Sequence, residues 1–355
     1  MIAGPLRVLI VDDSRIFRSV IEEALSNRTD VQVVGSVFSG EKALEFARSS
    51  PPDFVTLDVE MPGIGGMETL RGLREIATRT KHPVGVLLIS SHTKRGAAVT
   101  IEGLQEGAFD FIHKPESPDT FANAESLRSQ LFEKIDAFVS RYTKGWATLS
   151  STGKSHRVVQ SVNRYRAVLI GSSTGGPEAL SRLLPVLAPI CPVPIFLVQH
   201  FPADFTEYFV ASLSRRCGIN IQESRDGCIA EPGVVYVARG GIHMVLNKVD
   251  GQVAIGSSES PSENGCRPAV DVLFRSASVA YAGQVLAVVL TGMGCDGANG
   301  AVVLKRAGAR VLVQDEPSSI VWGMPGSVVA SGAADEILPI GDIGSALLGH
   351  LGIGE

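Results

Sequence analysis

The stretch Leu6-Arg7-Val8-Leu9-Ile10-Val11-Asp12-Asp13 decides the fold of the first third of the chain. It predicts a buried strand that ends in two acids. A second apolar run, Phe54-Val55-Thr56-Leu57, ends in Asp58. Because the carboxyl ends of parallel strands share one edge of a sheet, we expect these carboxylates to meet there. Three carboxylates make an oxygen-only pocket that suits Mg²⁺ and an acceptor for phosphoryl transfer.

The region up to about residue 125 alternates between β-branched runs and helical patterns. This alternation predicts a doubly wound parallel sheet of five β/α units. Strands are expected at residues 6–12, 31–37, 54–58, 84–90 and 109–113. A helix is expected over residues 15–27, where apolar side chains recur with helical spacing.

Composition predicts a two-domain protein without a nucleic-acid partner. The chain has 355 residues, 45% of them hydrophobic, which is enough for more than one core. A net charge of −5 opposes general binding to nucleic acid or anionic membranes. The N-terminus does not have a signal-peptide pattern, and apolar runs are too short for direct membrane insertion. The five cysteines, odd in number and without Cys-x-x-Cys spacing, indicate reduced thiols and a cytoplasmic location.

The second half of the chain predicts another α/β domain. A helix with apolar positions from Leu127 to Val139 leads into a Ser-, Thr-, Gly- and Lys-rich stretch, which we interpret as a linker. Strands are then expected at residues 165–170, 195–198, 234–237, 285–290 and 310–313, in a doubly wound, mostly parallel sheet. The expected domains are residues 1–125 and 163–350, joined by a helix extension and linker over residues 126–162.

Two further residues complete the pattern of the first acidic site. Lys114 follows one predicted strand and could pair with a phosphoryl group on Asp58, and Ser90 closes another and offers a hydroxyl. A single acid such as Asp13 could equally be a helix cap. Together the residues resemble the response-regulator receiver family over residues 5 to about 125. The resemblance implies Mg²⁺ at Asp12, Asp13 and Asp58, phosphorylation of Asp58, and switch roles for Ser90 and Lys114.

One segment departs from the receiver pattern. Residues 61–66 read Met-Pro-Gly-Ile-Gly-Gly, where the family usually has Met-Pro-x-Met-Asp-Gly. An acid is therefore missing after the phosphorylation loop. We expect a looser loop and retained phosphorylation.

A glycine-rich turn opens the second domain. Gly171-Ser172-Ser173-Thr174-Gly175 reads as Gly-x-Ser-x-Gly between a strand and a helix, a setting that exposes a serine hydroxyl. The amides at the start of the following helix could stabilise an oxyanion. The same amides could instead cradle a phosphate, and this loop by itself leaves the two interpretations even.

A serine nucleophile needs a base and an acid that orients it. His200 follows the apolar strand at residues 195–199 directly, and Asp296 follows the strand at residues 285–290 and a short loop. His243 is the competing base, but its place in a turn favours a structural hydrogen bond equally. Ser173, His200 and Asp296 then fall at three strand ends on one sheet edge.

Longer motifs make a resemblance specific. They are Gly171 to Gly176, Gln199-His200-Phe201-Pro202, Arg267 to Phe274, and Thr291 to Gly297. These motifs resemble the C-terminal domain of the chemotaxis protein-glutamate methylesterases. The resemblance implies that Ser173 is the nucleophile, His200 the base and Asp296 its orienter, with amides near Thr174 and Met293 holding the oxyanion.

The resemblance implies a phosphorylation-regulated hydrolase. Its substrates would be methylated glutamates on the cytoplasmic helices of chemoreceptors, with methanol released, and it would also deamidate receptor glutamines. A chemotaxis histidine kinase would be the phosphodonor, and the receiver would obstruct the esterase edge until Asp58 is phosphorylated. The esterase site itself would need no metal or cofactor.

Four residues depart from the methylesterase pattern. Cys295 stands where Asn is common, Cys266 where His is usual, Phe201 where Met usually follows the histidine, and Arg239 where Pro is usual. They leave the three candidate catalytic residues in place and bear on substrate preference. We interpret both cysteines as small buried residues.

Two other functions remain as alternatives. A receiver could be joined to a nucleotide-binding output that uses Gly171 to Gly176, but Pro177 and Glu178 replace the Gly-Lys-Ser/Thr ending of a phosphate loop. A non-catalytic signalling adaptor is the other alternative, and an intact serine, histidine and aspartate set argues against it.

Overall fold

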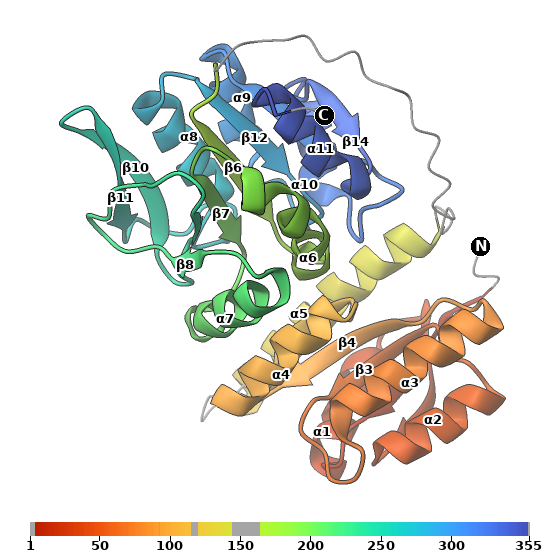
Figure 1. Ribbon diagram of the computed structural model, residues 1–355. Coiled ribbons are helices and arrows are strands. Elements are labelled where there is room, and N and C mark those ends of the chain that lie inside the picture. The colour runs from red at the N-terminus through yellow and green to blue at the C-terminus, as the bar shows by residue number, and fades with distance from the viewer. Residues whose placement is uncertain (1–3, 92, 115–119, 144–163, 354–355) are drawn as a thin grey trace. The chain divides into compact units, whose positions relative to one another are not determined.

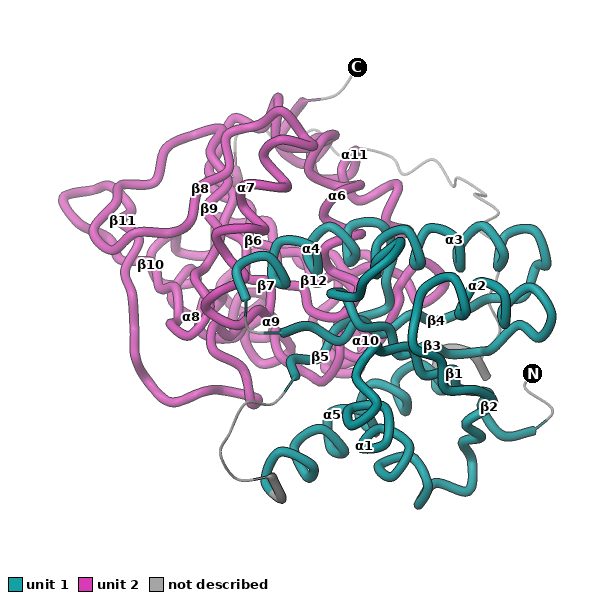
Figure 2. The backbone as a smooth tube through the Cα atoms, turned by 90° about the horizontal axis from the view of Figure 1, so that it is seen from below, with its two compact units in different colours: residues 1–146 teal, residues 147–355 magenta. Residues whose placement is uncertain are grey.

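The computed structural model describes residues 4–91, 93–114, 120–143 and 164–353. The chain divides into two compact units, residues 1–146 and 147–355 (Figure 2). Most of the predicted linker lies outside the described residues, and the domain boundaries at 125 and 163 stay predictions. The predicted α/β fold is confirmed in both units.

Unit 1 is a five-stranded parallel sheet with strand order β2-β1-β3-β4-β5 (Figure 2). Its strands are β1 Leu6–Val11, β2 Val31–Val37, β3 Phe54–Asp58, β4 Gly85–Ser90 and β5 Asp110–His113. Its helices are α1 Arg15–Ser26, α2 Gly40–Ser49, α3 Gly65–Thr80, α4 Lys94–Gln105 and α5 Thr120–Thr143. The five predicted strands are therefore all present.

Local sequence signals set the helix starts in unit 1. Ser14, Ser39 and Thr93 precede α1, α2 and α4, and each side chain accepts a hydrogen bond from an amide of the first turn. These bonds satisfy amides that have no partner within the helix. The central strands β3 and β4 are buried along their whole length, so apolar residues on both faces stabilise them.

Unit 2 is built on a seven-stranded parallel sheet of order β14-β13-β12-β6-β7-β9-β8. Its strands are β6 Ala167–Ser172, β7 Ile195–Gln199, β8 Ile221–Glu223, β9 Val235–Val237, β12 Val285–Val289, β13 Arg310–Gln314 and β14 Glu336–Leu338. Its helices are α6 Gly176–Leu187, η1 Ala188–Ile190, η2 Ala203–Phe205, α7 Thr206–Cys217, α8 Val270–Ala280, α9 Ala298–Arg306, α10 Gly323–Ala330 and α11 Ile340–His350.

Four strands of unit 2 were not predicted. β8 and β14 have three residues each, too few to show a periodic pattern. The other two, β10 His243–Val249 and β11 Gln252–Ser258, form an antiparallel hairpin that contacts α8 (Figure 1). Its turn is Asp250-Gly251, both with positive φ, a pair that favours tight hairpins.

Both sheets reverse their winding direction at one strand pair. In unit 1 the chain leaves β1 for β2 on one side and returns to β3 on the other; in unit 2 it leaves β6 for β7 on one side and later reaches β12 on the other. Loops separate at such a switch point and leave a crevice beyond the strand ends. The candidate residues follow these strands. Within the described residues, no helix has the length and apolar character needed to cross a membrane.

Candidate functional sites

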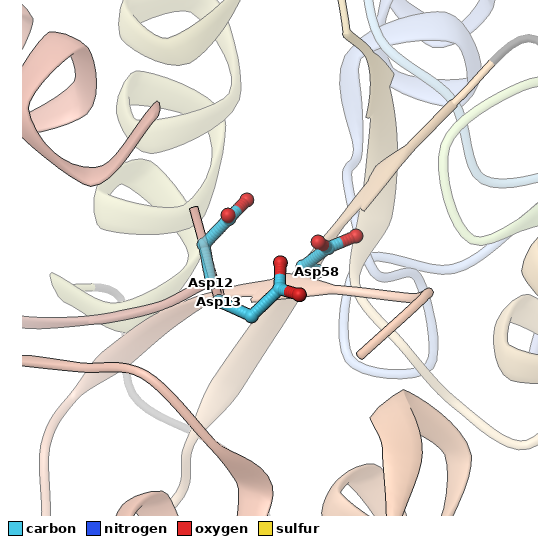
Figure 3. Close-up of side chains that lie close together, drawn as sticks. All are labelled: Asp12, Asp13 and Asp58. Atoms are coloured by element: carbon cyan, nitrogen blue, oxygen red, sulfur yellow. The ribbon is translucent and has the colours of Figure 1, made fainter. Parts of the chain in front are cut away.

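The acidic residues of unit 1 meet at the ends of β1 and β3. One oxygen from each of Asp12, Asp13 and Asp58 lies within 4.8 Å of the others (Figure 3). Asp12 and Asp58 are buried and Asp13 is exposed. Lys114 Nζ lies 2.7 Å from Asp58 Oδ2 and 2.9 Å from Asp12 Oδ2. The structure therefore brings together the four charged residues that the sequence predicted for this site.

One cation serves two buried carboxylates here. Burial raises the pKa of Asp58 to about 6, the Asp12 carboxylate adds to the rise, and Lys114 only partly opposes it. Burial alone would lower the pKa of Lys114, but its hydrogen bonds to Asp12 and Asp58 outweigh burial and raise it. The site therefore has an excess of negative charge and an all-oxygen donor set, which fits Mg²⁺.

Ser90 lies at the end of β4, next to β3 in the sheet. It is fully buried, and its hydroxyl donates to the carbonyl of Ser91 at 3.2 Å.

The loop at residues 61–66, whose sequence departs from the receiver pattern, contains Gly63 and Gly65, both with positive φ. The Ile64 amide donates to Glu41 Oε1 at 3.1 Å. The expectation that this loop is looser stays a prediction.

In unit 2, Ser173 follows β6 in the turn before α6 and is half-buried. Its amide donates to the carbonyl of Thr291 at 3.1 Å, which joins the turn to the loop after β12. A Cβ on Gly292 would lie 2.9 Å from Ser173 Cβ and 2.3 Å from Met324 Sδ, so only glycine allows this approach. Gly175 holds the turn with a φ of 78°.

His200 and Asp296 pair at the same edge. His200 Nε2 lies 2.8 Å from Asp296 Oδ2. That oxygen also accepts from the Val270 amide at 2.6 Å, and the Oδ1 atom accepts from the amides of Asp271 and Gly297, each at 3.0 Å. The carboxylate is thus fixed by the start of α8 and by its own loop, and it fixes the imidazole ring.

The same contacts set the charge of the pair. Burial opposes the ionised form of Asp296, but hydrogen bonds from His200 and from the Asp271 and Val270 amides outweigh it, and its pKa is lowered. Burial likewise lowers the pKa of His200, but hydrogen bonds to Asp296 and Cys266 outweigh it and raise the pKa to about 9. Both shifts favour the charged forms, a carboxylate at Asp296 and an imidazolium at His200.

The two predicted oxyanion residues lie in the loops that meet at Ser173. Thr174 is buried in the turn, and its carbonyl accepts from Thr291 Oγ1 at 2.9 Å. Met293 lies in the loop after β12, and its amide has no acceptor within the described residues. An unpaired amide can stabilise a developing oxyanion.

The competing histidine, His243, is fully buried at the start of β10. Its Nδ1 accepts from the Ala269 amide at 3.1 Å, and Nε2 lies 3.2 Å from the carbonyl of Pro261. Both ring nitrogens are thus occupied by backbone groups. This arrangement supports the structural interpretation of His243.

Three residues that position the candidate catalytic groups were not predicted from the sequence: Gln199, Asn264 and Asp271. Gln199 accepts from Ser172 Oγ at 2.7 Å and donates to the Ser173 carbonyl at 3.0 Å. The Asn264 amide donates to Asp296 Oδ1 at 3.1 Å and to Asp271 Oδ2 at 3.0 Å. Gln199 and Asp271 lie inside the motifs quoted above, but Asn264 lies just outside them.

The prediction that Cys266 and Cys295 are small buried residues is wrong. Cys295 is exposed and Cys266 is only partly buried, because both lie in loops at the sheet edge. Phe201 is instead buried against Phe205 and Phe209, which explains a larger side chain there. Arg239 is exposed, with Nε 3.6 Å from Glu223 Oε1.

The fold and the two sites define a class of protein, a receiver with an acidic pocket joined to a hydrolase domain of α/β architecture. Residues 8–125 match the family model of the response regulator receiver domain, and residues 168–347 match that of the CheB methylesterase. The chain belongs to the receiver-containing protein-glutamate methylesterase family.

Two relatives match nearly the whole chain, and one solved structure matches its second half. A protein named protein-glutamate methylesterase/protein-glutamine glutaminase from Trichodesmium erythraeum is 41% identical over 98% of this chain and 99% of its own length. A protein of the same name from Nocardioides is 39% identical over 98% and 95%. The crystal structure of the Thermotoga maritima CheB methylesterase catalytic domain has 39% identity and a TM-score of 0.51, covering 52% of this chain and 97% of that one.

Proposed function

We propose that this chain removes methyl esters from glutamate side chains of chemoreceptors, with Ser173 as nucleophile, His200 as base and Asp296 as its orienter. The observation that carries the proposal is the 2.8 Å hydrogen bond between His200 and the buried, fully hydrogen-bonded Asp296, at the edge where Ser173 lies. The names of the relatives support glutamate side chains of proteins as the substrate class, and the resemblance of the sequence motifs implies that these proteins are chemoreceptors.

The geometry supports a path for the proton in this proposal. Asp296 holds Nε2 of His200, so Nδ1 is the nitrogen that takes the Ser173 proton. The serine oxygen attacks the ester carbonyl carbon, and the amides near Thr174 and Met293 stabilise the tetrahedral oxyanion. His200 returns the proton to the leaving methanol, and water then releases the glutamyl group from Ser173. For a receptor glutamine, ammonia leaves by the same route.

The acidic site of unit 1 would regulate this reaction. Asp58 accepts the phosphoryl group from a chemotaxis histidine kinase, and Lys114 and Ser90 respond to it. Asp12, Asp13 and Asp58 would hold Mg²⁺, which when bound neutralises the negative charge of the carboxylates and of the incoming group. The proposed substrate helices are those on the cytoplasmic side of chemoreceptors, so the proposal includes a cytoplasmic location.

The test is methanol release from methylated receptor fragments by the full chain, with and without acetyl phosphate and Mg²⁺. We expect release that rises with the phosphodonor and is abolished in Ser173→Ala. Ser172→Ala is the matched control, because Ser172 is adjacent but fully buried against Gln199 and should keep most of the activity. Equal loss in both variants would contradict the assignment of Ser173, and release from no form would favour a non-catalytic adaptor.

Regulation by unit 1 has its own test. Removing residues 1 to about 155 is expected to raise the activity seen without phosphodonor. Unchanged or lower activity in the shortened chain would contradict a restraining role for the receiver.

A further inference from the structure

The thiol of Cys266 contacts the ring nitrogen of His200 that the proposed reaction requires. Cys266 Sγ lies 3.4 Å from His200 Nδ1, on the opposite side of the ring from Asp296. In contrast, the Ser173 hydroxyl has no hydrogen bond to His200 within the described residues. In this structure the thiol, and not the serine, therefore contacts the base.

Cys266, His200 and Asp296 form the arrangement that activates a nucleophilic thiol. The carboxylate orients the imidazole through Nε2, and Nδ1 can take the S–H proton to give a thiolate beside an imidazolium. The thiolate is the form of cysteine that attacks electrophiles. Cys266 is also only partly buried, so a small reagent can reach it.

We propose that Cys266 is a covalent modification site for small electrophiles and disulfides, and that a group attached to its sulfur closes the esterase site. The first half stands on the contacts of Cys266 alone. The second half rests on the proposed function, because it requires His200 Nδ1 to serve Ser173. With Nε2 held by Asp296, an adduct on a sulfur 3.4 Å from Nδ1 fills the space that the serine hydroxyl must reach.

The reaction with a low-molecular-weight disulfide is balanced. The Cys266 thiolate attacks one sulfur, a new S–S bond forms, and the original S–S bond breaks. The other sulfur leaves as a thiolate and takes the proton held on His200. A free thiol in excess reverses the exchange, so the closed site reopens.

Cys295 serves as an internal reference because it is more exposed than Cys266. It is exposed, while Cys266 is only partly buried, so accessibility alone would make Cys295 the faster thiol. Its sulfur lies 3.8 Å from Asn264 Oδ1 and, within the described residues, has no contact with a ring nitrogen. The order of reaction of the two thiols therefore separates activation by His200 from simple access.

The first experiment measures alkylation of the full chain by iodoacetamide at neutral pH, resolved by residue with peptide mass spectrometry. We expect Cys266 to react at least about tenfold faster than Cys295, with iodide as the leaving group. In His200→Gln the Cys266 rate should fall to that of Cys295 or below it. Equal or faster labelling of Cys295 in the unchanged chain overturns the proposal even if the His200 variant does not fold.

The second experiment treats the chain with a small disulfide and follows methanol release. Activity should fall in step with the Cys266 adduct and return with dithiothreitol, and Cys295→Ser should behave like the unchanged chain. Cys266→Ala should keep its own starting activity under the same treatment; equal loss there overturns closure by Cys266. Because labelling is read by mass, a chain that releases no methanol contradicts the proposed function and leaves the test of the thiol intact.

Discussion

Two buried aspartates, Asp58 at the end of β3 in unit 1 and Asp296 in the loop after β12 in unit 2, have opposite environments. Asp58 accepts one backbone amide, that of Glu60, and one bond from Lys114, which it shares with Asp12. Asp296 accepts from three backbone amides, from the Asn264 amide and from His200. Accordingly the pKa of Asp58 is raised and that of Asp296 is lowered.

The difference follows from what each carboxylate is proposed to do. A carboxylate that accepts a phosphoryl group must keep an oxygen available. The free-energy cost of burying its charge is then only partly offset by hydrogen bonds. A carboxylate that orients a base is held best when every lone pair is used. Incomplete hydrogen bonding at a buried acid thus indicates a reactive group, and complete hydrogen bonding indicates a positioning group.

The largest expected effect comes from changing Asp296, whose carboxylate is fully hydrogen-bonded. Asp296→Asn keeps the size of the side chain but presents an amide to His200 Nε2, which favours the wrong tautomer. We expect methanol release to fall on the order of 10⁴-fold. Asp271→Asn is the matched control, because Asp271 is equally buried and shares Asn264 but does not contact His200. A similar loss in both variants would contradict an orienting role specific to Asp296.

A second prediction concerns the pH dependence of the esterase. The base must be neutral to accept a proton, and the pKa of His200 is about 9, so activity should rise with pH toward that value. Cys266→Ala removes a hydrogen bond that raises this pKa, so the rise should move to lower pH. Activity at neutral pH then increases about tenfold for each pH unit that the pKa falls. Cys295→Ser should leave the profile in place, and an unmoved profile in Cys266→Ala would contradict the coupling.

The third prediction tests the incompletely bonded acid. Asp58→Asn should remove the response to phosphodonor and stabilise unit 1 at neutral pH by about 1 kcal/mol, because it removes one of two buried carboxylates and leaves Lys114 paired with Asp12. The folded-state pKa of Asp58 lies above its ordinary value of 3.8, at about 6, so protonated Asp58 favours folding and this stability is lost as pH rises through 6.

The gain in Asp58→Asn should therefore be present at pH 7 and disappear below pH 4. Urea unfolding of the full chain without Mg²⁺, followed by a probe in unit 1, measures it. Asp13→Asn is the control, because Asp13 is exposed and should change stability little. Lower stability of Asp58→Asn at neutral pH would contradict the argument.

The sites could be located from the sequence because the ends of buried strands can be recognised in it. Asp12, Asp58, Ser173 and His200 each lie within three residues of the end of an apolar run, and parallel strands bring such positions to one edge. Asn264 and the contact of Cys266 with His200 depend instead on how the segment between β11 and α8 folds back. No periodic pattern encodes that path. The short strands β8 and β14 were missed for the related reason that three residues show no period.

The smallest expected effect comes from the residue that links the two acids of unit 2. Asn264 donates one amide to both Asp271 and Asp296, and its φ of 53° disfavours most other side chains. Asn264→Gly accepts that backbone geometry and removes only the amide. A lost hydrogen bond to a fixed carboxylate corresponds to about 1 kcal/mol, so methanol release should fall about fivefold. Asn264→Ala adds backbone strain and should also lower the unfolding free energy. Four donors to Asp296 remain in the glycine variant. A loss of methanol release as large as that in Asp296→Asn would therefore contradict the argument. It would show that the orientation of His200 depends on this one amide and not on the full set of hydrogen bonds to the carboxylate.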